Sequence, residues 1–471
     1  MNTLPRLAAA FSLALVLAMS SVVALAQQIT PLRLSYVEGE VSFWRFGAED
    51  WAEARHNIPL AAGDELYVGS RGVIELQAGG RAFVRADSDT QLSLLTQTAD
   101  FLQFRITTGR VSFDLRTLPS GHAIEVNTPN AVFTIDRSGY YRVDVDGEVH
   151  FITRRGGRAV MVPAGGQPMN IYPSEEIVVR GDGVARAETY VAPDPDRWDR
   201  WNYERTDSLL DAVSERYLPP GVAGAYDLDH YGRWRVVAEY GPVWVPEVVP
   251  VGWAPYSSGR WIWDPYYEWT WIDDAPWGWA PFHYGRWVFI GGYWAWAPGP
   301  VFGVSVYAPA LVAFFDLGPS LSVSIGFGTP GLAWVALGWG EPLLPWWGRP
   351  GFIGRPWWGG WWGPRVINNV VVKQTTVINV THITYVNSRV SNAVVATHRE
   401  RFTRGGWDDK PRRLTHTTQT RLQPLRGVLP VKPEPASLIA GLPGSVRPPE
   451  AVLERPVVVK RVPSEPKLPW R

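Results

Sequence analysis

The sequence predicts a mainly β protein, and three features of its composition and pattern support this fold class. The 471 residues include 46 Gly and 41 Pro, which interrupt helices and favour short strands joined by turns. Short segments of alternating apolar and polar residues recur over residues 32–183. A Trp-rich motif then repeats at offsets of 27 and 26 residues. We therefore expect an N-terminal β-sandwich or short β-solenoid, one linker helix, a β-hairpin repeat domain and a disordered Pro-rich tail.

The charge balance and the absence of cysteine exclude several classes of protein. Lys+Arg and Asp+Glu each number 45, so the net charge does not favour nucleic acid or an anionic membrane surface as a partner. Because the chain has no Cys, it has no disulfides, no thiolate metal sites and no cysteine nucleophile. Attachment through an acylated N-terminal Cys is excluded for the same reason.

Residues 1–26 predict a cleavable signal peptide. Arg6 supplies a positive charge, residues 7–23 are apolar, and Ala24-Leu25-Ala26 is a small-x-small cleavage site. The alternative is an uncleaved membrane anchor, but the Ala-x-Ala ending and the polar Gln27-Gln28 favour cleavage after Ala26. We expect a periplasmic or secreted protein without a transmembrane segment after cleavage.

Residues 32–184 predict the first β domain, and residues 194–218 predict a linker with one amphipathic helix. In the β domain, strands such as Val73-Ile74-Glu75-Leu76 offer one apolar face to a core, because successive side chains point to opposite sides. Pro193-Asp194-Pro195-Asp196 is a favourable helix start, and Pro219-Pro220-Gly221 ends the helix.

The first domain carries a series of short motifs in a fixed order. They are Val37-Glu38-Gly39-Glu40-Val41, Gly63-Asp64-Glu65-Leu66, Thr108-Gly109-Arg110-Val111-Ser112, Val126-Asn127-Thr128-Pro129-Asn130-Ala131, Gly139-Tyr140-Tyr141-Arg142-Val143-Asp144-Val145 and Val162-Pro163-Ala164-Gly165. This order resembles the FecR domain, an extracytoplasmic all-β module. The best-known FecR proteins are membrane-spanning anti-sigma regulators with a cytoplasmic segment. The present chain places the domain after a cleavable signal instead, which argues against that regulatory role.

Residues 225–347 predict a Trp-rich domain of repeated hairpins. Gly232-Arg233-Trp234, Gly259-Arg260-Trp261 and Gly285-Arg286-Trp287 each begin a unit, and a second aromatic strand follows each of them. An isolated hairpin is marginally stable in water, so stacked units bury what one unit alone leaves exposed. Three apolar strands are expected after the hairpins, over residues 304–315, 321–327 and 332–337.

The remaining residues predict three segments of different character. Residues 348–366 form a Gly/Trp-rich low-complexity loop, and residues 367–406 form a β extension with an alternating pattern. Residues 407–471 are rich in Pro and basic residues and contain few long apolar runs, so we expect a disordered tail.

Several segments outside the first domain also match a known family. These are residues 227–234, 277–287, 307–314 and 385–387. They resemble a family of exported bacterial proteins that have a Trp-rich domain of unknown function and often an N-terminal FecR domain. The resemblance implies the architecture and leaves the activity open.

Five repeat tryptophans are candidate binding residues: Trp234, Trp261, Trp271, Trp287 and Trp296. An indole is large, flat and amphipathic. In one interpretation, the rings form an exposed strip on which sugar rings stack, with peptidoglycan or another envelope polysaccharide as the ligand. In the other, they are the core of thin hairpins that have little else to bury. Solvent exposure of these rings distinguishes the two.

Three arginines precede repeat tryptophans and are candidates for binding anionic glycan or phosphate: Arg233, Arg260 and Arg286. The alternative role is structural, by cation–π stacking or hydrogen bonding to the neighbouring unit.

The pattern of polar residues does not favour an enzyme or a metal site. His230 and His283 precede two of the Gly-Arg-Trp motifs, but Ser257 takes this place in the middle unit, whereas a metal needs converging ligands. The paired Asp273-Asp274 are adjacent, so they do not straddle a bond as glycosidase carboxylates must. We expect no catalytic residue, no cofactor and no metal.

Taken together, these features predict a non-catalytic exported cell-envelope protein with a binding or scaffolding role. Cell-wall glycan at the Trp-rich repeats is the candidate ligand. The alternatives are a structural module that meets another envelope protein, FecR-type signalling, and an uncharacterised carbohydrate-active enzyme.

Overall fold

The computed structural model describes residues 29–181, 184–299, 301, 305–324, 327, 329–358, 365–367, 370–372, 385–404, 412–414, 422–439, 441–463 and 466. The predicted signal peptide lies outside these ranges, as does most of the predicted β extension between residues 368 and 384. Within these ranges, no helix has the length and apolar character needed to cross a bilayer.

The N-terminal domain is built from strands, as predicted. They are β1 (Leu32–Glu38), β2 (Val41–Trp44), β3 (Ala52–Glu53), β4 (Pro59–Leu60), β5 (Asp64–Val68), β6 (Val73–Ala78), β7 (Ala82–Ala86), β8 (Thr90–Gln97), β9 (Phe101–Leu115), β10 (Ala123–Asn127), β11 (Ala131–Ile135), β12 (Gly139–Asp146), β13 (Glu148–Arg154), β14 (Ala159–Pro163), β15 (Met169–Ile171), β16 (Glu175–Arg180) and β17 (Arg186–Val191). These 17 strands form one hydrogen-bonded network. The first half of β9 pairs with β8 and, in parallel, with β10, and its second half pairs with β7 and β12. The mainly β fold class is confirmed.

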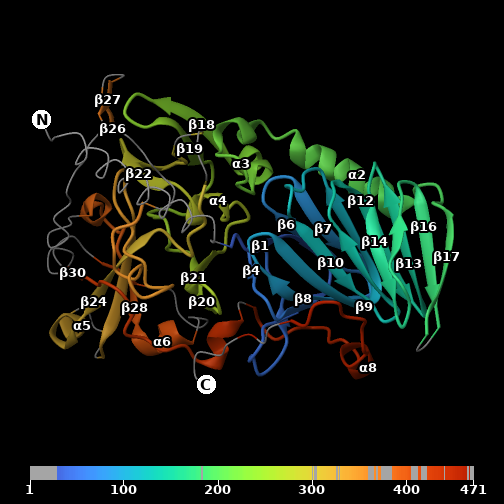
Figure 1. Cartoon of the computed structure of the whole chain (residues 1–471). Helices are drawn as coiled ribbons and strands as arrows, with labels where there is room; N and C mark the ends of the chain where they lie inside the picture. The colour runs from blue at the N-terminus through green and yellow to red at the C-terminus, as the bar shows by residue number, and fades with distance from the viewer. Residues whose placement is uncertain are drawn as a thin grey trace, which may run out of the picture.

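The linker is helical, but it forms two pieces instead of one. Helix α2 (Arg197–Leu210) lies along the upper edge of the N-terminal strands (Figure 1) and begins at a capping box between Asp196 and Asp199. It ends before Ala212, whose backbone is extended, and η1 (Val213–Tyr217) follows as a 3-10 turn. Its buried residues include polar ones, and Asp199 accepts a 2.7 Å hydrogen bond from the Tyr140 hydroxyl.

The Trp-rich repeat folds into the three predicted hairpins. Helix α3 (Ala225–Tyr231) leads into β18 (Gly232–Val237) and β19 (Gly241–Pro246), followed by β20 (Gly259–Asp264) with β21 (Glu268–Asp273), α4 (Ala280–His283), and β22 (Arg286–Ile290) with β23 (Tyr293–Ala297). The register places a Trp pair directly across each hairpin: Trp234 opposite Trp244, Trp261 opposite Trp271, and Trp287 opposite Trp296. The outer two hairpins join into a four-stranded sheet, and the middle hairpin stands apart.

A five-stranded sheet follows the hairpins. It contains β24 (Val312–Leu317), β25 (Gly331–Ala336), β28 (Val395–His398), β29 (Arg412–Arg413) and β30 (Gln423–Pro424). The chain between these strands also contains β26 (Arg365–Ile367) and β27 (Val370–Val372), which form a separate two-stranded sheet, and η3 (Val386–Arg389) and α6 (Arg399–Thr403).

The strand predicted over residues 321–327 is wrong at residues 321–324, because these residues lie in helix α5 (Pro319–Ser324). Residues 325 and 326 lie outside the described ranges. Proline is favoured in the first turn of a helix, since its ring presets φ and the missing N–H has no partner there in any case. The Ser322 hydroxyl donates 2.8 Å to the Leu317 carbonyl, which ties the helix to the preceding strand. The alternating pattern of Leu, Ser and Val therefore does not reflect a strand.

The described parts of the predicted disordered tail make defined contacts, which corrects the prediction of disorder for them. They contain η4 (Pro435–Leu438) and α8 (Glu450–Leu453), and the segment runs beneath β8 and β9 (Figure 1, red). Leu438 is buried. The backbone N–H of Glu53 donates 2.7 Å to the Leu442 carbonyl. Composition alone predicted too little order for this segment, because main-chain hydrogen bonds to a sheet need no apolar side chains.

The middle hairpin joins the two domains. Ile262 and Ile272 point to one side, where they pack into the core of the N-terminal domain. The rings of Trp261 and Trp271 point to the other side, into the aromatic core of the repeat domain. Because side chains alternate along a strand, one hairpin contributes to both cores.

Candidate functional site

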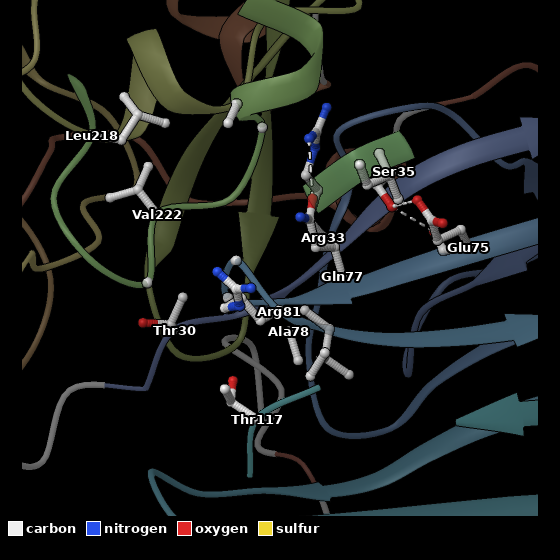
Figure 2. Close-up of a pocket in the computed structure, with 18 of the residues that line it drawn as sticks. Thr30, Arg33, Ser35, Glu75, Gln77, Ala78, Arg81, Thr117, Leu218 and Val222 are labelled. Carbon is white, nitrogen blue, oxygen red and sulfur yellow. Dashed lines mark hydrogen bonds between the residues drawn. The ribbon is translucent and has the colours of Figure 1, made fainter. Parts of the chain in front are cut away.

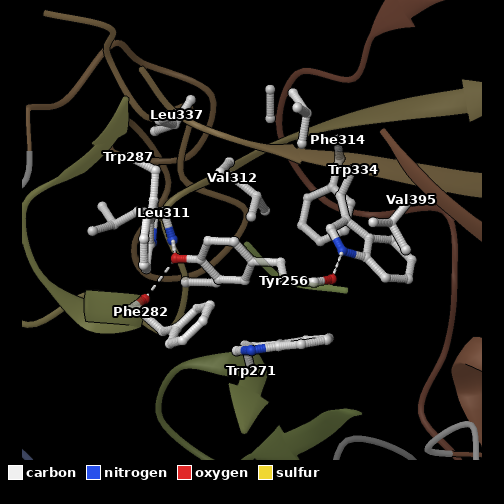
Figure 3. Packing of buried hydrophobic residues seen from close by; sticks show 14 of the residues in the cluster. Tyr256, Trp271, Phe282, Trp287, Leu311, Val312, Phe314, Trp334, Leu337 and Val395 are labelled. Carbon is white, nitrogen blue, oxygen red and sulfur yellow. Dashed lines mark hydrogen bonds between the residues drawn. The ribbon is translucent and has the colours of Figure 1, made fainter. Parts of the chain in front are cut away.

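The tryptophans of the repeat domain form a continuous aromatic core (Figure 3). Tyr256 lies within it, and its hydroxyl donates 2.7 Å to the Phe282 carbonyl and accepts 2.9 Å from the Leu311 N–H. The Trp334 indole donates 2.9 Å to the Tyr256 carbonyl. These bonds pair the polar atoms of Tyr256 and the indole N–H of Trp334 inside the core, as buried polar groups require.

Four of the five predicted binding tryptophans are buried in this core. Trp261 is 3% exposed, Trp287 is 1% exposed, and Trp271 and Trp296 are 0% exposed. Trp234 is half-buried, stacks on Tyr217 with ring centroids 4.4 Å apart, and donates 2.7 Å to the Ser214 hydroxyl. The rings of Trp261 and Trp271 meet at 65°, so they are not coplanar. By the exposure criterion above, the four buried tryptophans are core residues and do not form an exposed strip on which sugars stack.

The glycine of each Gly-Arg-Trp motif makes room for a tryptophan of the opposite strand. A Cβ atom on Gly232 would lie 2.3 Å from the Trp244 ring, and one on Gly259 would lie 2.5 Å from the Trp271 ring. On Gly285 it would lie 2.6 Å from Trp296 Nε1. In the sequence this glycine marks the start of each unit, and its recurrence before Arg-Trp is the signal that could have indicated the close contact with a Trp ring.

Substituting Gly232 with Ala is expected to lower the free energy of unfolding by about 1–3 kcal/mol, the usual cost of overpacking a close contact. The Trp244 ring is fully buried, so it has no solvent-exposed side toward which to shift. Chemical denaturation measures the change. Gly318→Ala is the matched control, because a Cβ there would meet nothing within 4 Å. Equal stability of the two variants would contradict the packing role of Gly232.

The three predicted binding arginines do not converge on one site. Arg233 is 78% exposed and pairs with Glu247. Arg260 Nη2 lies 3.1 Å from Asp274 Oδ1. Arg286 is buried and donates to the carbonyls of Gly285 and Glu341 at 2.7 and 3.0 Å. These contacts fit the structural alternative, because each guanidinium bonds within the fold: Arg233 and Arg260 to acidic residues that follow their own hairpins, and Arg286 to the loop after β25.

The histidines and acidic residues of the repeats are also engaged in the fold. His283 is buried with Nδ1 2.8 Å from the Ala308 carbonyl, and burial lowers its pKa to about 3, which keeps the imidazole neutral. Asp273 accepts hydrogen bonds from the Trp271 indole and the Ala275 N–H. Among the described residues, no group of three His, Cys, Asp or Glu side chains is arranged to hold a metal ion.

A cavity of about 1110 Å³ lies where the N-terminal sheet meets η1, the loop that follows it and α3 (Figure 2). One part of its wall is apolar and is formed by Leu102, Leu118, Ile124, Leu209, Leu218 and Val222. Tyr36, Tyr226 and Tyr231 add aromatic rings. The lining comes from segments far apart in the sequence, and sequence reasoning did not identify it.

Three ion pairs lie in the cavity wall, which also contains Arg216 and Asp100. Arg33 lies 2.5 Å from Asp227, Arg205 lies 2.8 Å from Glu75, and Arg81 lies 3.0 Å from Glu215. Each pair brings one cation and one anion to the wall, so the paired groups add no net charge.

Two titratable groups in this wall, Glu75 and His56, are each held in a single charge state. Burial opposes ionisation of Glu75, but Arg85 and Arg205 outweigh it and lower the pKa of this carboxyl to about 2. Burial and the nearby Arg33 lower the pKa of His56 to about 3. At neutral pH, Glu75 is therefore ionised and His56 is neutral.

Residues 225–341 match a family of unknown function, DUF6600. The match covers α3, the three hairpins and the strands β24 and β25.

Two crystal structures from Parabacteroides distasonis ATCC 8503, both of candidate anti-sigma factors, are distantly similar to the chain. The first is 17% identical over 27% of this chain and 59% of that chain, with a TM-score of 0.24. The second is 15% identical over 33% of this chain and 68% of that chain, with a TM-score of 0.25. The chain thus spans less than two thirds of the first structure. No curated protein matched the sequence.

Proposed function

We propose that the protein is a non-catalytic, exported cell-envelope protein that binds its ligand in the cavity between the N-terminal sheet and α3. The Trp-rich hairpins act as the scaffold that holds α3 against the sheet. The observation that carries the proposal is the cavity itself, because both domains contribute to one wall in which arginines and acidic residues balance in number.

The ligand class that suits this wall is an uncharged section of an envelope glycan such as peptidoglycan. A polyanion would favour a wall with an excess of cations, whereas this wall contains four arginines and four acidic residues. Tyr226 and Tyr231 supply rings on which sugar C–H faces can stack, and Gln97 supplies an amide for hydroxyl groups.

A binding role also suits the charge states of Glu75 and His56. A general acid or base needs a pKa near the working pH. The pKa of Glu75 lies at about 2 and that of His56 at about 3, so neither group exchanges a proton readily at neutral pH. Both groups instead hold the wall in shape, since Glu75 bonds to Ser35 at 2.7 Å and His56 Nε2 lies 3.1 Å from Arg33.

A substitution that narrows the cavity tests the glycan proposal. Thr117 is exposed and lines the cavity, so Thr117→Trp fills part of it without disturbing a core. Thr189→Trp is the matched control, because Thr189 is exposed on β17 and does not line the cavity. In a pull-down with isolated peptidoglycan, we expect Thr117→Trp to lose at least about ten-fold in affinity, or about 1.4 kcal/mol. Thr189→Trp should match the wild type.

The reference in this pull-down is an unrelated exported β-protein. Equal retention of that protein and the wild type would overturn the glycan proposal, and so would equal loss by both Trp variants. The burial of the repeat tryptophans then favours the second candidate function, a structural module that positions its N-terminal domain for a protein partner.

A further inference from the structure

A polar stripe crosses the outer face of β9 and β10 in the N-terminal domain. Phe104 and Ile106 point into the core, so Gln103 and Arg105 lie on the opposite face. Gln103 Nε2 donates 3.0 Å to Glu125 Oε1 on the neighbouring strand, and Asn127 Nδ2 donates 3.3 Å to the same oxygen. Gln103, Glu125 and Asn127 are all buried, although they lie outside the hydrophobic core.

Residues 453–461 of the C-terminal segment cover this stripe. Gln103 Nε2 donates 2.7 Å to the Arg461 carbonyl, and Asn127 Nδ2 donates 2.7 Å to the Val458 carbonyl. The Val458 N–H donates 2.9 Å to the Thr128 carbonyl, which adds a sheet-like main-chain bond. Arg105 donates to the carbonyls of Leu453 and, at 3.0 Å, Arg455.

Most of these contacts recognise the backbone of the segment. The stripe supplies side-chain donors, and the segment supplies carbonyl oxygens at residues 453, 455, 458 and 461. Two side-chain contacts are added, from the Arg455 guanidinium to the Thr107 carbonyl at 2.9 Å and from the Arg461 guanidinium to the Phe101 ring at 3.9 Å.

The segment itself buries few of its side chains. Val459 and Lys460 are exposed, and Val462, directly after the segment, is 85% exposed. A segment held by hydrogen bonds and little apolar burial opens at low free-energy cost compared with a core strand. The stripe is thus a built, polar binding surface, and its present occupant is weakly anchored.

We propose that this stripe is a binding site for an extended peptide, and that residues 453–461 occupy it as an exchangeable intramolecular plug. The ligand class is a proline-containing extended chain that presents its carbonyl oxygens to Gln103, Arg105 and Asn127. A tethered segment competes at a millimolar effective concentration, so a free peptide binds well only after the plug is weakened. This site differs from the proposed glycan cavity and assigns a second ligand class to the protein.

The test uses the full chain and a fluorescently labelled synthetic peptide of residues 450–463. Val458→Pro removes the N–H that bonds to the Thr128 carbonyl and weakens the plug. We expect this variant to bind the peptide at least about ten-fold more tightly than the wild type in fluorescence anisotropy. Val462→Pro is the matched control, because its side chain is exposed and it lies beyond these contacts; it should bind like the wild type.

A substitution in the stripe tests the binding surface itself, independently of the substitution in the plug. Asn127→Leu removes the amide that donates to the Val458 carbonyl. The double variant Asn127→Leu/Val458→Pro should bind the peptide at least about ten-fold more weakly than Val458→Pro. The single variant Asn127→Leu should be cleaved by trypsin after Lys460 several-fold faster than the wild type, because the plug is released. Equal or weaker peptide binding by Val458→Pro, or unchanged binding and cleavage in the Asn127→Leu variants, would overturn the proposal.

Discussion

Replacing Trp261 with Ala is expected to lower the free energy of unfolding by about 3–5 kcal/mol, the range for removing a buried Trp from a packed core. The Trp261 ring has centroids of Trp271, Phe314, Trp334, Trp346 and Phe402 within 6.1 Å. Removing it leaves a cavity that several rigid aromatic rings are unable to close. Chemical denaturation monitored by circular dichroism measures the change.

The control for this variant is Trp234→Ala, at the equivalent position of the first repeat. Trp234 is half-buried at the edge of the core, so we expect a loss of about 1–2 kcal/mol for its stacking and its hydrogen bond to Ser214. If Trp261 instead served as an exposed platform, its loss would leave stability unchanged and reduce ligand binding. A similar, small effect of both substitutions would contradict its place in the core.

Replacing Arg45 with Ala is expected to cost about 3–5 kcal/mol, because it leaves a buried carboxylate without its counter-ion. Arg45 is completely buried and bonds to both carboxylate oxygens of Asp64, at 2.9 and 2.7 Å. It also donates 3.0 Å to the Trp263 carbonyl of the middle hairpin. The substitution therefore weakens both the N-terminal domain and its joint with the repeat domain.

The double variant separates the ion pair from the rest of this effect. Removing Asp64 as well eliminates the unpaired charge, so Arg45→Ala/Asp64→Ala should be less destabilised than the sum of the two single variants. Arg233→Ala serves as a surface control, because this exposed ion pair should change stability by less than about 1 kcal/mol. Additive losses in the double variant would contradict a coupled buried pair.

The sequence patterns that depend on local geometry predicted the fold well. The spacing of Gly232, Gly259 and Gly285 located the three hairpins, and alternating strands located the N-terminal domain. Local pattern failed at α5, where Pro319 starts a helix in a segment that alternates like a strand. It failed again in the tail, where backbone bonds to the sheet replace apolar burial.

The candidate site depended on contacts that no local pattern contains. Whether Trp271 is core or platform is decided by Tyr256 and Trp334, which reach it from other parts of the chain. The cavity brings Arg33 of β1 next to Asp227 of α3, which are 194 residues apart. Neither residue stands out in the sequence, because isolated Arg and Asp residues are common on any surface.

Hydroxyl-radical footprinting read by mass spectrometry, with and without soluble peptidoglycan fragments, tests most directly whether ligand meets the cavity and the tryptophans form the core. We expect Trp261, Trp271, Trp287 and Trp296 to oxidise much more slowly than Trp234 in the free protein, because all four are buried. Added fragments should protect Tyr226 and Tyr231 of the cavity wall. Rapid oxidation of the four tryptophans, with protection of these tryptophans and not of Tyr226 and Tyr231 by the fragments, would contradict both assignments.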